Sequence, residues 1–170
     1  MKSLPAALLI LPFALTNTLS AKDKPLPSPE DFDPAKYMGK WYEVARLPTP
    51  VQPEGTLATA EYSAGAGKGM VVVKNTAYDA DGKLLRAMEG KAQLVEGEAK
   101  GRLKVSFGPA LPESTNYCVL RVDKRYRAAV VGSPDRGSLW ILSRKVPVPE
   151  KRLNRLVKVA ERAGYDTSKL

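Results

Sequence analysis

From Trp41 onward, apolar and polar residues alternate over short stretches that end at residues with turn chemistry. Because side chains along a strand point to opposite faces in turn, a period of two predicts strands. Clusters rich in glycine, aspartate or proline lie at 65–69, 79–82, 97–101 and 134–137, and they favour tight hairpin connections. The pattern predicts strands at residues 41–48, 57–63, 70–78, 84–94, 102–107, 116–123, 128–133 and 138–144.

Short strands at this spacing favour an all-β fold, either a barrel or a sandwich. Eight strands that close on themselves leave no exposed edge and enclose room for one small ligand. We therefore predict an eight-stranded antiparallel up-and-down β-barrel. A solid barrel filled by its own side chains is the alternative. Several positions predicted to point inward are alanine or valine, which favours a hollow interior.

The period changes to that of a helix near the end of the chain. Pro149 suits the first turn and Gly164 suits the stop. The two faces of the helix separate apolar from basic residues, with Leu153, Leu156, Val157, Ala160 and Ala163 on one side and Lys151, Arg155, Lys158 and Arg162 on the other. We expect this C-terminal α-helix to pack outside the barrel.

The sixth and seventh predicted strands show which part of the barrel the helix covers. The fifth strand alternates apolar with polar residues, whereas residues 117–122 and 128–131 are apolar on both faces except at Arg121. A strand that is apolar on both faces is buried on both. The helix is therefore predicted to cover these two strands, and Cys118 to be a buried thiol beneath it.

Residues 1–21 have the features of a secretory signal peptide: Lys2, a short apolar run and a small residue at Ala21. An uncleaved membrane anchor is the alternative, but the run is shorter than the ~20 residues that a spanning helix needs. Residues 22–32 carry three prolines and predict an extended, poorly packed leader. The folded domain is then expected at residues 33–170.

The amino-acid composition limits the catalytic and metal-binding chemistry that the chain can perform. The chain has 170 residues, a formal net charge of +9, no histidine and one cysteine. The usual general base, the usual zinc ligands and an intramolecular disulfide are thereby removed, and we expect no metal and no cofactor. No nucleic-acid-binding motif is present, so the positive charge is interpreted as an attraction to anionic membrane surfaces.

Several motifs resemble the lipocalin family in order along residues 31–169. Gly39-Lys40-Trp41-Tyr42-Glu43-Val44-Ala45-Arg46 opens the first strand, and Leu139-Trp140-Ile141-Leu142-Ser143-Arg144 closes the last. Further matches to bacterial and apolipoprotein D-type members lie at 89–92, 104–109 and 123–127. The resemblance implies a lipocalin (calycin) barrel whose floor is built by Gly39, Trp41 and Arg144, with the Arg144 guanidinium over the Trp41 ring.

The resemblance also implies the function. The family binds fatty acids, lysophospholipids and similar hydrophobic molecules, usually without chemistry, and many bacterial members are anchored to the outer membrane through a lipidated N-terminal cysteine. This sequence has no such cysteine. We therefore expect an exported protein, periplasmic or secreted and in some association with the outer membrane, that carries a fatty acid or lysophospholipid in the bacterial cell envelope.

Strand parity, counted from Arg144 and from the similarity to retinol-binding lipocalins, gives the predicted ligand contacts. They are Ala60, Tyr62, Val71, Val73, Asn75, Val105, Phe107, Tyr117, Val119, Trp140 and Leu142. The hydroxyls of Tyr62 and Tyr117 and the amide of Asn75 would be the polar groups of this pocket. Arg46, Arg121 and Arg127 are candidates for holding an anionic group, and the same parity makes Arg121 the first of them, although it could equally pair with Glu43 or Glu89.

Two other functions stay open at this point. A membrane-surface interaction protein would use the basic helix and leave the pocket incidental. An enzyme on the same scaffold would need an activated thiol facing the cavity, and Cys118 has the wrong parity for that. Acid–base chemistry by Glu43 or Glu89 with Tyr62 has no motif behind it.

Overall fold

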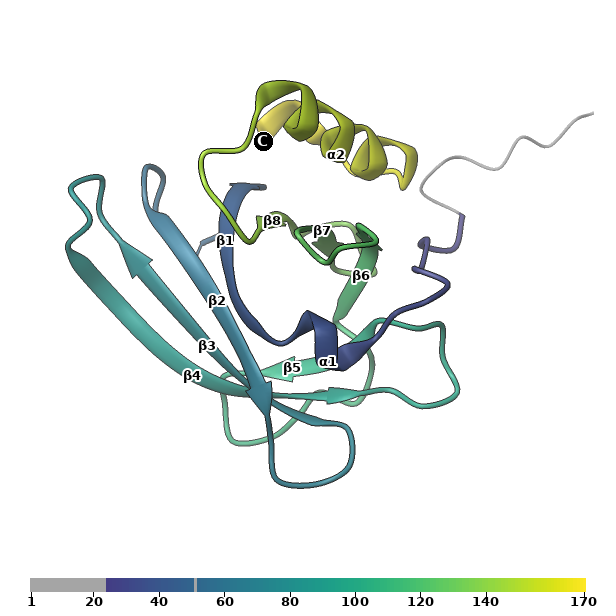
Figure 1. Ribbon diagram of the computed structural model, residues 1–170. Helices are drawn as coiled ribbons and strands as arrows, with labels where there is room; N and C mark the ends of the chain where they lie inside the picture. Colours follow the sequence, from purple (N-terminus) through teal and green to yellow (C-terminus); the bar gives the residue numbers. More distant parts are fainter. Residues whose placement is uncertain (1–23, 51) are drawn as a thin grey trace, which may run out of the picture.

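The computed structural model describes residues 24–50 and 52–170, and across these residues the chain forms a closed antiparallel barrel of eight strands, each paired with its sequence neighbours (Figure 1). The first and last strands pair to close it. The strands are β1 (Gly39–Arg46), β2 (Leu57–Ala64), β3 (Met70–Tyr78), β4 (Leu84–Leu94), β5 (Arg102–Ser106), β6 (Tyr117–Val122), β7 (Ala128–Gly132) and β8 (Leu139–Ser143). The predicted fold class is confirmed.

The strand bounds follow the turn residues closely, and two differences have local causes. The first strand begins at Gly39 and ends at Arg46, two residues earlier than predicted, because Gly39 turns the chain into the strand with a φ of +89°. The alternation pattern also missed the short helix α1 (Pro34–Tyr37), which begins at Asp33, whose carboxylate accepts the Ala35 N–H.

Helix α2 (Glu150–Arg162) lies along the outside of the barrel, over β6, β7 and β8 (Figure 1). Its buried residues Leu156 and Ala160 belong to one apolar cluster with Cys118 of β6 and Val130 of β7. The predicted placement of the helix is therefore confirmed, with β8 as a third covered strand. Cys118 is 2% exposed, and burial raises the pKa of its thiol.

A second apolar cluster fills the closed end of the barrel. Its members include Tyr37, Trp41, Tyr62, Val71 and Val119. The two clusters take alternate residues of β6 and β7, so these strands separate an inner core from an outer one. This arrangement explains why both faces of β6 and β7 are apolar in sequence.

Arg144 closes the floor of the barrel. Its guanidinium lies 3.8 Å from the centre of the Trp41 ring and donates to the carbonyls of Lys36, Tyr37, Met38 and Lys40. Trp41 is fully buried, and its indole N–H donates to the carbonyl of Tyr37 at 2.8 Å. One side chain thus ties the end of β8 to the segment that leads into β1.

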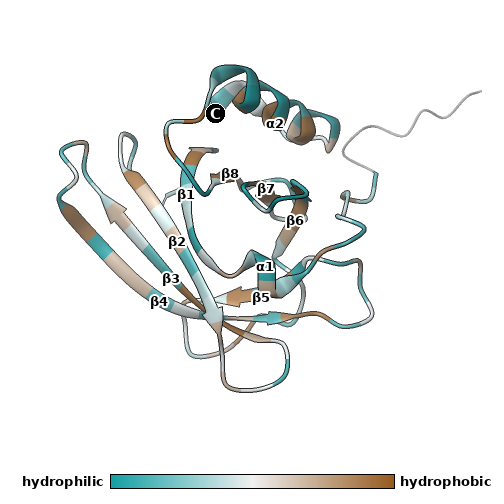
Figure 2. Ribbon diagram, viewed as in Figure 1, coloured by the Kyte–Doolittle hydropathy of each residue, from teal (hydrophilic) through white to brown (hydrophobic). Residues whose placement is uncertain are grey.

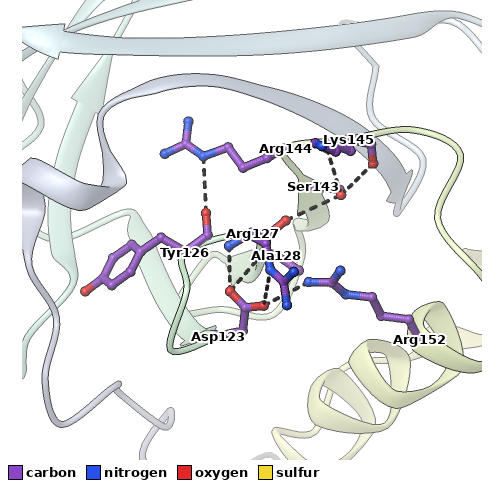
Figure 3. Close-up of polar contacts among 8 residues, drawn as sticks. All are labelled: Asp123, Tyr126, Arg127, Ala128, Ser143, Arg144, Lys145 and Arg152. Atoms are coloured by element: carbon purple, nitrogen blue, oxygen red, sulfur yellow. Dashed lines mark hydrogen bonds and ion pairs between the residues drawn. The ribbon is translucent and has the colours of Figure 1, made fainter.

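The turn between β6 and β7 fastens the floor to the helix (Figure 3). The Asp123 carboxylate accepts from the backbone of Arg127 and from the Arg152 guanidinium of α2, the latter at 2.8 Å. The carbonyl of Tyr126, which has a φ of +52°, accepts from Nε of Arg144 at 3.2 Å. The floor, the turn and α2 therefore form one hydrogen-bonded unit.

The described part of the leader is extended, but it lies against the barrel. Arg102, which is 8% exposed, donates to the carbonyls of Leu26 and Pro27, and Arg136 donates to that of Lys24. The expectation of poor packing is therefore wrong for residues 24–32. The predicted signal peptide at residues 1–21 lies outside the described residues.

A β-bulge overturns one predicted site residue. In β6 the register shifts between Val119 and Arg121, so Leu120 is an extra residue. Val119 and Val122 both pack in the inner cluster, while Arg121 is exposed on the outer face. The prediction that Arg121 points inward is wrong because a bulge reverses the parity of every residue that follows it.

Candidate ligand-binding cavity

A cavity of about 460 Å³ occupies the barrel above the packed floor. This volume lies within the range of small-molecule sites. All eight strands and four positions outside them contribute lining residues: Glu43, Thr49, Gln52, Ala58, Thr59, Ala60, Tyr62, Val73, Asn75, Thr76, Ala77, Arg86, Met88, Val105, Phe107, Asn116, Tyr117, Val131, Trp140 and Leu142. The interior is therefore hollow at one end and packed at the other.

Most of the predicted ligand contacts line this cavity, namely Ala60, Tyr62, Val73, Asn75, Val105, Phe107, Tyr117, Trp140 and Leu142. Val71 and Val119 do not. They are 4% and 0% exposed and lie in the inner cluster, where the Tyr37 ring from α1 fills the closed end. The inward direction of Val71 and Val119 follows from strand parity. Parity does not show at which level of the barrel the packed core ends and the cavity begins.

Three tyrosine hydroxyls meet at the bottom of the cavity. The Tyr117 hydroxyl lies 2.8 Å from that of Tyr37 and 2.9 Å from that of Tyr62. Burial raises the pKa of Tyr62 to about 12 and holds the pKa values of Tyr37 and Tyr117 well above the usual range. All three phenols therefore stay neutral near neutral pH and satisfy one another in an apolar setting.

Replacing Tyr117 with phenylalanine should lower the free energy of unfolding by about 1–3 kcal/mol, because the hydroxyls of Tyr37 and Tyr62 both lose their partner. Denaturant unfolding measures this change. Tyr42→Phe is the control, because the Tyr42 hydroxyl has no hydrogen bond among residues 24–50 and 52–170, and it should change stability by less than about 0.5 kcal/mol. Equal stabilities for the two variants would contradict the role of the tyrosine cluster.

A polar corner lies where β1 meets the β1–β2 loop. A register shift between Glu43 and Ala45 brings Arg46 opposite Trp140, a residue of the cavity wall. The Glu43 carboxylate accepts from Arg46 at 3.4 Å and from the Gln52 amide at 3.0 Å, and burial raises its pKa against the effect of Arg46. Nε of Arg46 and Oγ1 of Thr49 are buried with no hydrogen-bond partner among the described residues.

The cavity opens to solvent along β3, β4 and the end of β5. Asn75, Arg86 and Asn116 are exposed lining residues, and Phe107 is 39% exposed. Arg86 and Met88 were missed from sequence because no face was assigned to β4. The tight turn at 79–82 would by itself place Ala87 opposite Asn75, whereas a register shift at Leu85 places Met88 opposite Asn75 and Arg86 opposite Ala77.

The described residues offer little for metal or nucleophilic chemistry. Within residues 24–50 and 52–170, no three histidine, cysteine, aspartate or glutamate side chains come together in a way that could hold a metal ion. Cys118 packs on the helix side of β6, away from the cavity lining. Among the same residues, no helix combines the length and the apolar character that crossing a membrane requires.

A closed antiparallel barrel with an apolar cavity defines a class of proteins that bind small molecules. Comparison with known proteins gives the family. The model of the lipocalin-like domain matches residues 32–170. Outer membrane lipoprotein Blc of Escherichia coli K12 is 37% identical over 140 residues, covering 82% of this chain and 77% of that protein. Its counterpart in Vibrio cholerae is 35% identical over 167 residues, covering 97% and 95%.

Apolipoprotein D of Macaca fascicularis is 31% identical over 150 residues, covering 85% of this chain and 77% of that protein. The chain belongs to the lipocalin family, in the group that contains Blc and apolipoprotein D. Among solved structures, insecticyanin of Manduca sexta has a TM-score of 0.62 at 24% identity, covering 85% and 80% of the two chains. Apocrustacyanin C2 has a TM-score of 0.58 at 19% identity, covering 81% and 76%. Both show the same fold.

Lipocalins bind small hydrophobic molecules and are generally carriers rather than enzymes. The floor residues Gly39, Trp41 and Arg144 lie at the closed end and are not part of the cavity lining. The positions that resemble the family most clearly therefore build the closed end of the barrel. The choice of ligand depends on the residues that line the cavity above them.

Proposed function

We propose that this protein binds and carries a fatty acid or lysophospholipid in the bacterial cell envelope. The observation that carries the proposal is the cavity of about 460 Å³, whose lining includes the apolar side chains of Val73, Val105, Val131 and Leu142 and whose charged lining residues are Glu43 and Arg86. Burial of about ten methylenes contributes ~8 kcal/mol before the costs of association, which is enough for micromolar binding.

The geometry suggests an orientation for such a ligand. Its acyl chain would lie along Val73, Val105 and Leu142, above the tyrosine hydroxyls that already bond to one another. Its polar end would face Asn75 and Arg86, which are exposed. A charged headgroup loses less hydration there than it would at the floor. The tyrosine hydroxyls were predicted as polar contacts for the ligand. In this arrangement they are uncharged groups at the bottom of the cavity, beneath the acyl chain.

We propose further that the protein acts by binding alone, without catalysing a reaction. The sequence has no histidine to activate a nucleophile. Its single thiol, Cys118, is buried under α2, and burial raises its pKa. A thiol needs access and a lowered pKa to react, so neither condition for a lipocalin with a catalytic cysteine is met.

The proposed location is the cell envelope or the medium outside the cell. Relatives in Escherichia coli and Vibrio cholerae carry the name outer membrane lipoprotein, and residues 1–21 have the features of an export signal. Because Cys118 is the one cysteine of the sequence, we propose an exported protein that is not lipidated at an N-terminal cysteine, periplasmic or secreted and associated with the outer membrane at most peripherally.

Replacing Trp140 with alanine should weaken binding of a fluorescent fatty acid about tenfold, because the indole forms part of the cavity wall and its loss leaves a section of the acyl chain without a partner. A fluorescence titration measures the dissociation constant. Tyr42→Phe, on the outer side of β1, serves as the control and should bind as the wild type does. Unchanged affinity in Trp140→Ala would remove the support for this wall as the ligand contact.

A further inference from the structure

Large apolar side chains are exposed at one end of the barrel wall. Leu57, Leu84 and Leu85 are 56%, 57% and 53% exposed. Figure 2 shows hydrophobic residues at the outer ends of β2 and β4, on the side of the barrel away from α2. A cluster of exposed leucines on a soluble protein indicates a contact surface, since single exposed apolar residues are normal but adjacent ones are not.

The strand register makes these residues neighbours. Leu57 of β2 pairs with Tyr78 of β3, and Tyr78 pairs with Leu84 of β4. Leu85 is the extra residue of a bulge at that point. We call Leu57, Tyr78, Leu84 and Leu85 the apolar rim.

The rim lies at the entrance of the cavity. The residues next to it along the strands, Ala58, Ala77 and Arg86, line the cavity, so rim and cavity wall alternate on the same three strands. Four residues further along the outer face of β2, Glu61 pairs with Lys74, which pairs with Glu89, and all three are exposed. The outer face thus changes from apolar to charged within about 13 Å.

The hairpin that presents the rim is well built. The Asp79 carboxylate accepts the N–H groups of Asp81 and Lys83, and the Asp79 N–H donates to the Lys83 carbonyl at 3.0 Å. The exposed leucines therefore project from a fixed turn, and an apolar surface held in place loses little conformational entropy when it docks.

We propose that the apolar rim docks onto the surface of a phospholipid bilayer and turns the cavity entrance toward the lipid. This inference rests on the proposed function, because an entrance that meets the bilayer is where a lipid would enter or leave. The short distance from the apolar rim to the charged residues of the outer face suits an interfacial site. In such a site, apolar side chains enter about 5–10 Å and charged groups stay in water.

Charge supports a bilayer as the occupant. The chain carries a formal net charge of +9, which attracts it to anionic lipid. Lys83 and Arg86 flank the rim leucines, and Asp79 and Asp81 balance them locally. The apolar side chains therefore supply the anchor, while the charge of the whole protein brings it to the surface.

A second copy of this chain fits the rim less well. Stable protein interfaces bury ~800 Å² per partner from about 20–30 residues, whereas the rim has four. Two copies that each carry +9 also repel one another. A lipid surface needs no matching area, so a small apolar patch is sufficient there.

Flotation with vesicles of phosphatidylethanolamine and phosphatidylglycerol tests the proposal. The double variant Leu84→Ser/Leu85→Ser should lower the vesicle partition coefficient at least about tenfold. The matched control is Val146→Ser, since Val146 is 52% exposed but lies in the β8–α2 connection, and it should partition as the wild type does. Equal partitioning of all three proteins would overturn the proposal, as would vesicle binding that salt abolishes and the leucine substitutions leave unchanged, which would assign the contact to the basic face of α2.

Two further measurements separate this inference from the proposed function. In vesicle-free solution the leucine variant should bind a fluorescent fatty acid with wild-type affinity, because the rim is outside the cavity lining. Rim-dependent flotation by a protein that binds no fatty acid would reject the carrier function and keep the docking surface. Sedimentation of a wild-type dimer that the leucine substitutions dissociate would overturn the bilayer as the occupant.

Discussion

Replacing Trp41 with alanine is expected to lower the free energy of unfolding by about 3–5 kcal/mol, the largest loss of stability that we predict for a single substitution. Trp41 is fully buried, its ring lies 5.0 Å from that of Tyr37, and its face is covered by Arg144. Removal of the indole leaves a void in the floor and a guanidinium without its aromatic partner. Chemical denaturation followed by circular dichroism measures the change.

The second tryptophan of the chain is the matched control. Trp140 lines the hollow part of the barrel and is half-buried, so Trp140→Ala enlarges a cavity that already exists and should cost clearly less stability than Trp41→Ala. The two variants are expected to separate, with Trp41→Ala losing mainly stability and Trp140→Ala losing mainly affinity. A Trp41→Ala protein that unfolds at the wild-type denaturant concentration would contradict the role of the floor.

Replacing Ala60 with tryptophan is expected to weaken lipid binding about fifty-fold. Ala60 lines the cavity between Trp41 of β1 and Asn75 of β3, so a larger side chain there enters the empty space. An indole that displaces about three methylenes of a ligand removes about 2.4 kcal/mol of transfer free energy. A titration with a fluorescent fatty acid measures the loss, and unfolding measures whether the fold is intact.

Ser63→Trp provides the matched control on the same strand. Ser63 is exposed on the outer face of β2, so the added ring lies in solvent and binding should stay at the wild-type level. Stability should change less in Ser63→Trp than in Ala60→Trp, because Ser63 is exposed whereas Ala60 packs against the inner apolar cluster. Wild-type affinity in Ala60→Trp would mean that the ligand does not occupy the space above the floor.

The barrel could be predicted from sequence because two local signals coincide along most of the chain. The bounds of β3 and β4 match the alternation, since glycine-rich or aspartate-rich turns fix both ends of each strand. The placement of α2 followed from the apolar residues on both faces of β6 and β7. In these places the periodicity, the turn chemistry and the burial all favour one structure.

The features that escaped prediction depend on backbone irregularities and on long-range packing. The bulge at Leu120 has no side-chain signature, and it turned Arg121 outward. The shift between Glu43 and Ala45 placed Arg46 beside the cavity wall in the same way. Tyr37 enters the barrel from a helix of four residues and fills the space beside Val71 and Val119, so the depth of the cavity follows from tertiary packing.

Native mass spectrometry of the full chain, purified from a bacterial envelope without removal of lipid, tests the central claim most directly. Our account predicts one fatty acid or lysophospholipid per chain, and a largely empty Ala60→Trp variant prepared in the same way. An empty wild-type protein that also takes up no fluorescent fatty acid would contradict the claim that this barrel is a lipid carrier.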